Sequence, residues 1–180
     1  MAKGALVGLK VIVWNTNDAK KLFSKGFYGK PFGIRKPKGT DFDAPLELSL
    51  IEALYLVEKG ELEVYADGNK LEYKELLKYC EKNIPRFKIL YHVYKDLRDK
   101  GYIVRSGLKF GCDYAVYELG PGIDHAPYLV HVLDVSEDID PVEIVRAGRL
   151  SHSVRKRFII ATTNPRVGQV KYIMFKWFKP

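Results

Sequence analysis

The chain has 180 residues, 47% of them hydrophobic, which is enough to bury the core of one large domain or two small ones. Its 30 Lys and Arg outnumber 22 Asp and Glu, and the net charge of +8 favours a polyanionic partner. Cys80 and Cys112 stand outside any CxxC spacing, so neither a disulfide framework nor a cysteine zinc site is indicated, and we expect two reduced, buried thiols. The apolar run within residues 1–14 is too short to span a membrane and has no signal-peptide cleavage pattern, so we expect a cytoplasmic protein.

Several elements of the first half can be predicted in chain order. Residues 6–14 are β-branched and apolar and predict a strand, and the turn and capping residues at 15–18 predict a short helix after it. Residues 30–45 combine Pro, Gly and basic side chains without periodicity, which is typical of a loop. The alternation of residues 61–70 predicts strands that end in a turn, and apolar residues between 76 and 80 predict a further helix.

A capping box marks the clearest helix of this half. Ser49 is followed three residues later by Glu52, ahead of an apolar stripe that includes Leu54. Gly60 supplies a C-terminal stop, so we predict a helix from about residue 50 to residue 59.

The second half begins with another predicted helix. Pro85 stands where a helix would begin, apolar residues recur at three- and four-residue spacing, and Gly101 can close the helix. We place a domain boundary near Ile84, which gives an N-terminal domain of residues 1–84 and a C-terminal domain of residues 85–180. The strand-like runs of the second domain are 102–105, 113–118, 127–134, 157–163 and 169–178, with a short helix opened by Asp140 and Pro141. The expected fold is therefore α/β (α+β), with a mixed, largely antiparallel five-stranded sheet in the second domain.

Positive charge is concentrated near the C-terminus. After Glu143 the remaining 37 residues carry no Asp or Glu but nine Lys or Arg. A basic balance alone fits a solvated surface equally well, whereas this one-sided distribution favours a nucleic-acid partner.

Three side chains of the second half suit chemistry on an RNA phosphodiester. RNA carries its own nucleophile, the 2′-hydroxyl, so cleavage needs a base, an acid and a group that stabilises negative charge. His125 can deliver a proton near neutral pH, and Lys156 can stabilise charge on the phosphate oxygens. Tyr117 is a poor base at its ordinary pKa of about 10, but a cationic neighbourhood would favour the phenolate. None of this chemistry needs a metal ion or another cofactor.

Each of these residues also has a simpler interpretation. A tyrosine at the end of a strand is usually half-buried packing, a histidine in a Gly-Pro loop is usually exposed, and a lysine is usually solvated. A metal-dependent nuclease that uses Asp113 and Glu118 is disfavoured, because an ExK pattern is missing. The spacing of His125 and His131 is likewise a weak indication of a metal site.

The sequences of three segments resemble those of the archaeal tRNA-splicing endonucleases. VYKDLRDKGYIVRSGLKFGCDYAVYELGPG (93–122) is similar to the segment that opens their catalytic domain, and SHSVRKR (151–157) is similar to their lysine-bearing motif. A weaker likeness extends through LSLIEALYLVEKGELEV (48–64). The resemblance therefore covers most of the chain.

The resemblance implies a function and a role for each candidate residue. Members of this family cut precursor tRNA at a bulge-helix-bulge and leave a 2′,3′-cyclic phosphate and a 5′-hydroxyl without a metal. By motif, Tyr117 corresponds to the general base, His125 to the general acid and Lys156 to the charge stabiliser. The alternative is a non-catalytic RNA-binding or structural subunit of the same assembly.

The resemblance also implies RNA-binding residues. Family members hold a bulged base between cationic side chains, a contact that suits any base. Arg149 occupies the matching position seven residues before Lys156, and would share its helical face if this stretch is helical. Lys171 is the candidate for the second cation.

One segment departs from the family. Homotetrameric members carry an acidic loop before the last strand, which inserts into a basic cleft of the opposing subunit. In this chain the loop reads TTNPRVGQV (162–170) and has Arg166 but no acid. We therefore expect a heterotetramer with a second, acidic-looped endonuclease subunit, with a homotetramer as the alternative.

Overall fold

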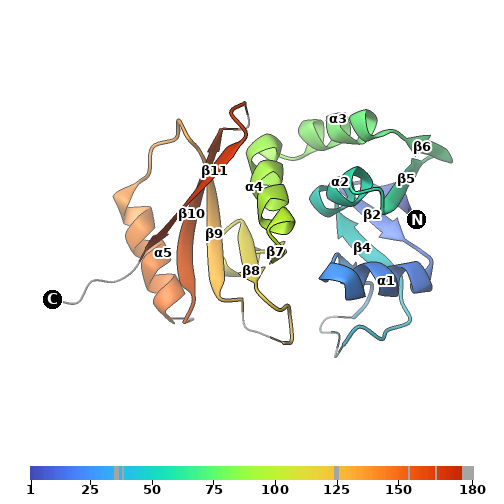
Figure 1. Cartoon of the computed structure of the whole chain (residues 1–180), viewed down its shortest axis with the longest axis horizontal. Coiled ribbons are helices and arrows are strands. Elements are labelled where there is room, and N and C mark those ends of the chain that lie inside the picture. Colours follow the sequence, from blue (N-terminus) through green and yellow to red (C-terminus); the bar gives the residue numbers. More distant parts are fainter. Residues whose placement is uncertain (35–36, 38, 124–125, 154, 165, 176–180) are drawn as a thin grey trace. The chain divides into compact units, whose positions relative to one another are not determined.

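A computed structural model describes residues 1–34, 37, 39–123, 126–153, 155–164 and 166–175 (Figure 1). The chain divides into two compact units, Met1–Phe87 and Lys88–Pro180. The division falls three residues after the Ile84 at which we placed the domain boundary. Each unit has its own sheet and its own helices, as the α/β (α+β) prediction requires, so that prediction is confirmed. Among the described residues, no helix is both long enough and apolar enough to cross a membrane.

The first unit is built on a six-stranded sheet in the order β3-β4-β2-β1-β5-β6. Strands β1 and β5 are parallel, and the other neighbouring pairs are antiparallel. The elements of this unit are β1 (Ala2–Val7), β2 (Lys10–Val13), α1 (Thr16–Gly26), β3 (Lys30–Pro31), β4 (Leu46–Ser49), α2 (Leu50–Glu58), β5 (Leu62–Ala66), β6 (Asn69–Leu71) and α3 (Tyr73–Asn83).

The capping box of this unit is confirmed. Ser49 Oγ accepts a hydrogen bond from the Glu52 amide at 3.2 Å, and Glu52 Oε2 accepts one from the Ser49 amide at 2.9 Å. Gly60, with φ of 69°, follows the end of α2. Local capping chemistry therefore sets both ends of this helix.

The single strand predicted over residues 6–14 is wrong. The chain reverses at Gly8, whose φ is 55°, and Val7 of β1 pairs with Lys10 of β2. Because glycine adopts this left-handed conformation without steric cost, it allows a two-residue hairpin turn inside an otherwise apolar run.

The second unit contains a five-stranded sheet in the order β11-β10-β9-β8-β7. Strands β9 and β10 are parallel and the remaining pairs are antiparallel, which confirms the predicted mixed, largely antiparallel sheet. The elements of this unit are α4 (Phe87–Asp99), β7 (Ile103–Ser106), the 3₁₀ helix η1 (Leu108–Phe110), β8 (Tyr114–Tyr117), β9 (Tyr128–Asp134), α5 (Pro141–Ser153), β10 (Arg157–Asn164) and β11 (Gln169–Phe175).

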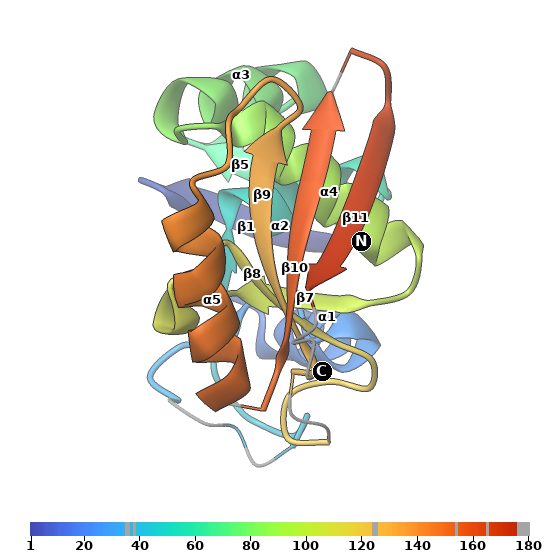
Figure 2. The ribbon, with the colours of Figure 1, turned by 90° about the vertical axis from the view of Figure 1, so that its left-hand side faces the viewer.

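Helices α4 and α5 cover opposite faces of this sheet (Figures 1 and 2). Tyr114 of β8 donates a hydrogen bond to the Leu90 carbonyl of α4 at 2.8 Å. Successive side chains of a strand point to opposite faces, so Ala115 and Tyr117 face the side of α5. Leu129, which pairs with Ala115, lies on that same side.

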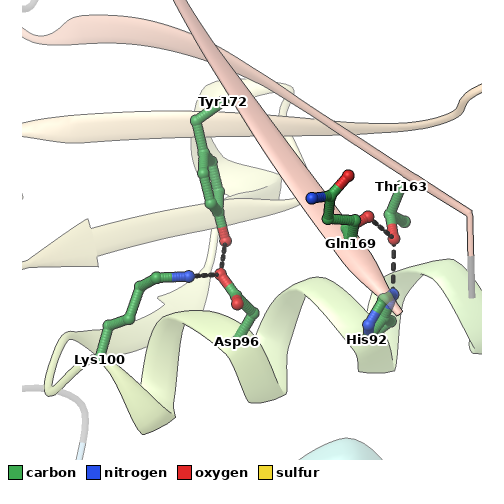
Figure 3. A network of polar contacts seen from close by, with 6 residues as sticks. All are labelled: His92, Asp96, Lys100, Thr163, Gln169 and Tyr172. Atoms are coloured by element: carbon green, nitrogen blue, oxygen red, sulfur yellow. Dashed lines mark hydrogen bonds and ion pairs between the residues drawn. The ribbon is translucent and has the colours of Figure 1, made fainter. Parts of the chain in front are cut away.

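Hydrogen bonds connect α4 to the hairpin formed by β10 and β11 (Figure 3). The Tyr172 hydroxyl donates to Asp96 Oδ2 at 2.5 Å, and Asp96 also pairs with Lys100. His92 Nδ1 lies 2.5 Å from Thr163 Oγ1, which donates to a main-chain carbonyl of β11 at 3.2 Å.

Candidate active site

The topology of the second sheet brings the ends of three strands together. Tyr117 is the last residue of β8, and β8 is antiparallel to β9. Because β9 and β10 are parallel, the start of β10 lies beside the start of β9, and the amide of Arg157 donates to the Pro127 carbonyl at 2.8 Å. Tyr117, the beginning of β9 and the beginning of β10 therefore lie at one end of the sheet, the lower end in Figure 2.

Tyr117 is half-buried at this end. Its ring packs against a small cluster formed by Ala115, Ala126 and Leu129, and Phe110 and Cys112 pack against the same cluster. The phenol is thus held by packing on the α5 side of the sheet, and its backbone pairs with Ile103 of β7. The interpretation of Tyr117 as a half-buried packing residue is therefore correct. The same packing holds its ring at the end of the sheet where β9 and β10 begin.

Lys156 is also half-buried and stands immediately before β10. Its Nζ donates to the Ala126 carbonyl at 2.7 Å and lies 5.2 Å from the centre of the Phe110 ring. Ala126 therefore links the two residues, since it belongs to the cluster against which Tyr117 packs and its carbonyl binds Lys156.

Lys156 does not share a helical face with Arg149. Helix α5 ends at Ser153, and Arg155 has φ of 56°, a left-handed conformation that ends the helix before the lysine. The conditional prediction of a shared face is therefore wrong. The helix is also longer than the short one predicted, with 13 residues, although it begins at Pro141 as predicted.

His125 lies outside the described residues. Its sequence neighbour Ala126 is described, is 2% exposed and accepts the bond from Lys156.

The other acidic and histidine side chains considered from sequence have different partners. Asp113 Oδ2 accepts the Val132 amide at 2.7 Å and lies 3.1 Å from His131 Nδ1, so these groups link the start of β8 to β9. Glu118 Oε1 accepts the Tyr128 hydroxyl at 2.8 Å. Within the described part of the chain, no three His, Cys, Asp or Glu side chains are grouped so that they could hold a metal ion.

The hydrogen bond to Glu118 changes the acidity of Tyr128. The carboxylate that accepts this hydrogen bond raises the pKa of Tyr128. Arg157, whose guanidinium lies 5.7 Å from the ring centre, opposes that effect only in part. Tyr128 therefore stays a phenol near neutral pH and is unsuited to the role of base.

The two predicted RNA-binding cations lie at different ends of the sheet. Arg149 is exposed in the last part of α5, which leads to the start of β10 near Lys156. Lys171 is exposed on β11 and pairs with Thr162 of β10. That position is about 20 Å along the strand from Lys156, at about 3.3 Å per residue. The fold of one subunit therefore brings Arg149 toward the site and does not bring Lys171 there.

Sequence reasoning missed Phe110 and the Ala126 carbonyl. A cavity of about 230 Å³ between α5 and the sheet is also lined by Phe110, together with apolar residues such as Leu129 and Phe158. These groups give the site an apolar wall, where a charge interacts more strongly than it does in water. The glycines around Phe110 were the only local sign of a special conformation, and its contact with Lys156 spans 46 positions of the sequence.

Comparison with known proteins identifies the family. Residues 2–77 match the tRNA intron endonuclease N-terminal domain, and residues 87–172 match the tRNA intron endonuclease catalytic C-terminal domain. The chain is 57% identical to the tRNA-splicing endonuclease of Hyperthermus butylicus over 181 aligned positions, which cover 100% of both proteins. It is 52% identical to that of Saccharolobus solfataricus, with 99% of this chain and 100% of the relative covered. The match thus includes both units, and the chain belongs to the tRNA-splicing endonuclease family.

Proposed function

We propose that this chain is the catalytic subunit of an endonuclease that excises introns from precursor tRNA. It cleaves at bulge-helix-bulge sites and leaves a 2′,3′-cyclic phosphate and a 5′-hydroxyl, which makes it an RNA lyase. The observation that carries the proposal is the convergence of Tyr117 and Lys156 around Ala126, the residue next to His125. Family membership and the names of the relatives support the substrate class.

Each residue has one role in the proposed reaction. Tyr117 takes the proton of the 2′-hydroxyl, whose oxygen then attacks the adjacent phosphorus. Lys156 stabilises the negative charge that develops on the phosphate oxygens, and its ammonium needs no proton exchange to do so. His125 gives a proton to the 5′-oxygen as the bond between phosphorus and that oxygen breaks.

Arg149 is proposed to bind the RNA rather than to react with it. Its exposed guanidinium near the Lys156 end of the sheet can stack on an unpaired base. Lys171 of the same chain lies on β11 beside Thr162, too far from the start of β10 to hold the other side of that base, so the proposal gives it no role in the site of its own subunit.

The proposed assembly is a heterotetramer of two copies of this chain and two copies of an acidic-looped subunit. The hairpin between β10 and β11 exposes Arg166, whose amide is bound by Asn164 Oδ1 at 3.0 Å. A basic hairpin does not complement a basic cleft on a second copy, whereas an acidic one from a different subunit does.

Single-turnover cleavage of a bulge-helix-bulge RNA by the assembled enzyme tests these roles. His125→Ala and Lys156→Ala should each slow cleavage by about 100-fold or more while RNA affinity changes by no more than a few fold. Tyr117→Phe should also slow the chemical step. Arg149→Ala should instead weaken RNA binding, by on the order of 1 to 3 kcal/mol.

Lys88→Ala is the matched control, because Lys88 is an exposed lysine on α4, at the opposite face of the sheet. It should cleave at the parental rate. A parental rate in the His125 and Lys156 variants would remove the catalytic assignments and favour the non-catalytic, RNA-binding subunit.

A further inference from the structure

The ammonium group of Lys156 lies over the aromatic ring of Phe110. The Nζ atom lies 5.2 Å from the ring centre, within the distance of about 6 Å at which the negative face of a ring attracts a cation. The same Nζ donates to the Ala126 carbonyl at 2.7 Å. We infer that Phe110 is a positioning residue for RNA cleavage, which with this carbonyl fixes the Lys156 charge at the reacting phosphate. The inference rests on the proposed function.

The backbone around Phe110 is built to hold one conformation. Phe110 ends the short helix η1, and its amide donates to the Gly107 carbonyl at 2.8 Å. A Cβ atom on Gly107 would lie 2.5 Å from Cys112 Sγ and 2.7 Å from the Cys112 carbonyl, so a larger residue there would displace the turn. Gly111 follows with φ of 67°, which favours glycine. The ring is therefore presented from a fixed turn.

The ring also connects the proposed base with the proposed cation. Phe110 and Tyr117 pack against the same cluster, in which Leu129 is 2% exposed. A movement of the Phe110 ring would therefore disturb the packing beside Tyr117 and the position of Lys156 together. Lysine has a long side chain with many rotamers, so a ring and a carbonyl that favour one of them lower the entropy lost when the phosphate is bound.

Electrostatics and shape can be separated at this position. Lys109 also lies over the ring, at 5.8 Å, but it is exposed, whereas Lys156 is half-buried and less screened by water. Fluorine atoms on the ring of phenylalanine withdraw charge from its face and change its shape little. If Phe110 has only a structural role, the enzyme should tolerate these fluorine atoms. If the ring attracts Lys156, cleavage should become slower with each fluorine atom added.

The experiment places phenylalanine with one, two and three ring fluorines at position 110 of the assembled enzyme. The single-turnover rate on a bulge-helix-bulge RNA should fall stepwise, by up to on the order of 10-fold, with RNA affinity and the melting temperature unchanged. Phe110→Tyr should keep most of the rate, and Phe110→Leu should lose about as much as the most fluorinated ring. The same series at Phe42 of the first unit, whose ring packs against Phe23 at 5.2 Å, is the matched control and should leave the rate unchanged.

A Lys156→Ala background distinguishes this inference from the proposed function. In that background the fluorine series at position 110 should have no effect, because the charge that senses the ring is gone. If Lys156→Ala slows cleavage but the series is flat in the parental enzyme, the role of Phe110 is refuted and the proposed function stands. If Lys156→Ala cleaves at the parental rate, the proposed function itself fails.

Discussion

Three tyrosines of the second unit differ in the groups that surround their hydroxyls. Tyr128 donates to Glu118 and Tyr172 donates to Asp96, and both carboxylates favour the protonated phenol. The pKa of Tyr172 is raised mainly by burial and further by Asp96, and that of Tyr128 is raised mainly by its bond to Glu118. Tyr117 instead packs against the apolar cluster that contains Ala126, whose carbonyl accepts a hydrogen bond from Lys156. Tyr128 and Tyr172 are therefore unsuited to act as a base, and Tyr117 is the phenol to which we assign that role in the proposed reaction.

The two thiols predict how stability depends on alkaline pH. Burial raises the pKa of Cys80 to about 12 and that of Cys112 to about 11. An unfolded thiol ionises near pH 8.5, so above that pH the unfolded chain loses protons that the folded chain keeps. The free energy of unfolding should therefore be unaffected by the thiols below about pH 8 and decrease as the pH rises from about 8.5 to 11. Urea unfolding at a series of pH values measures the slope.

Cys80→Ala supplies the control for this pH dependence. The slope between about pH 8.5 and 11 should be smaller in the variant, because one of the two ionisations is removed. An unchanged slope would mean that other groups dominate the alkaline loss. The prediction that both thiols are buried is wrong for Cys112, which is only partly buried.

Local chemistry explains which elements could be predicted from the sequence. The capping box of Ser49 and Glu52, the stop at Gly101 and the Asp140 start of α5 each depend on residues within one helical turn. The hairpin at Gly8 escaped prediction because its turn has no Asn-Gly or Asp-Gly pair and interrupts a continuous apolar run.

The candidate site was less accessible to sequence reasoning. Tyr117, His125 and Lys156 were proposed from their chemistry and from resemblance, and their spacing gave no indication of where they lie in the fold. Tyr117 and Lys156 lie at one end of the sheet because β9 and β10 pair in parallel, which brings residues about 30 positions apart together. Contacts such as that of Lys156 with Phe110 follow from this topology and have no local signature.

At the scale of elements, α4 is fixed to the last hairpin by two polar contacts on one helical face (Figure 3). His92 and Asp96 are four residues apart, so both project toward the hairpin. Thr163, which His92 contacts, is 1% exposed, so loss of that partner would leave a buried hydroxyl with one bond fewer. These contacts hold β10 and β11 in register on the face opposite the candidate site.

The substitution Tyr172→Phe tests how much the hydrogen bond between α4 and the hairpin contributes to stability. The substitution removes the hydrogen bond to Asp96 and leaves the ring in place, so it should lower the free energy of unfolding by about 1.5 to 3 kcal/mol, the range for a bond to a charged group. Chemical denaturation measures the loss, and the single-turnover rate at a temperature well below unfolding should stay near the parental value. A change in rate without a change in stability would place this network in the catalytic machinery, contrary to our assignment.

At the scale of the whole molecule, β11 is an edge strand that exposes apolar residues. Ile173 and Met174 are 48% and 41% exposed, and the strand pairs with β10 on one side within the described sheet. An apolar edge of this kind is suited to pair with a second copy. The hairpin beside it carries Arg166, which would not complement the basic cleft that the family resemblance implies on a second copy.

Light scattering on the isolated chain tests this arrangement. We expect a dimer formed through β11, and a heterotetramer when a second endonuclease subunit with Asp or Glu in the corresponding loop is added. Arg166→Glu should allow further association of the isolated chain, because it supplies one acidic group to the hairpin. A stable homotetramer of the unmodified chain would contradict the two-subunit assembly.

The chemistry of the cut ends tests the central claim most directly. The assembled enzyme is given a bulge-helix-bulge RNA in excess EDTA, and the ends of the products are identified by mass spectrometry. The proposed roles of Tyr117, His125 and Lys156 predict undiminished cleavage with a 2′,3′-cyclic phosphate on one fragment and a 5′-hydroxyl on the other. Cleavage that stops in EDTA and returns with magnesium, or that leaves a 5′-phosphate and a 3′-hydroxyl, would contradict the mechanism.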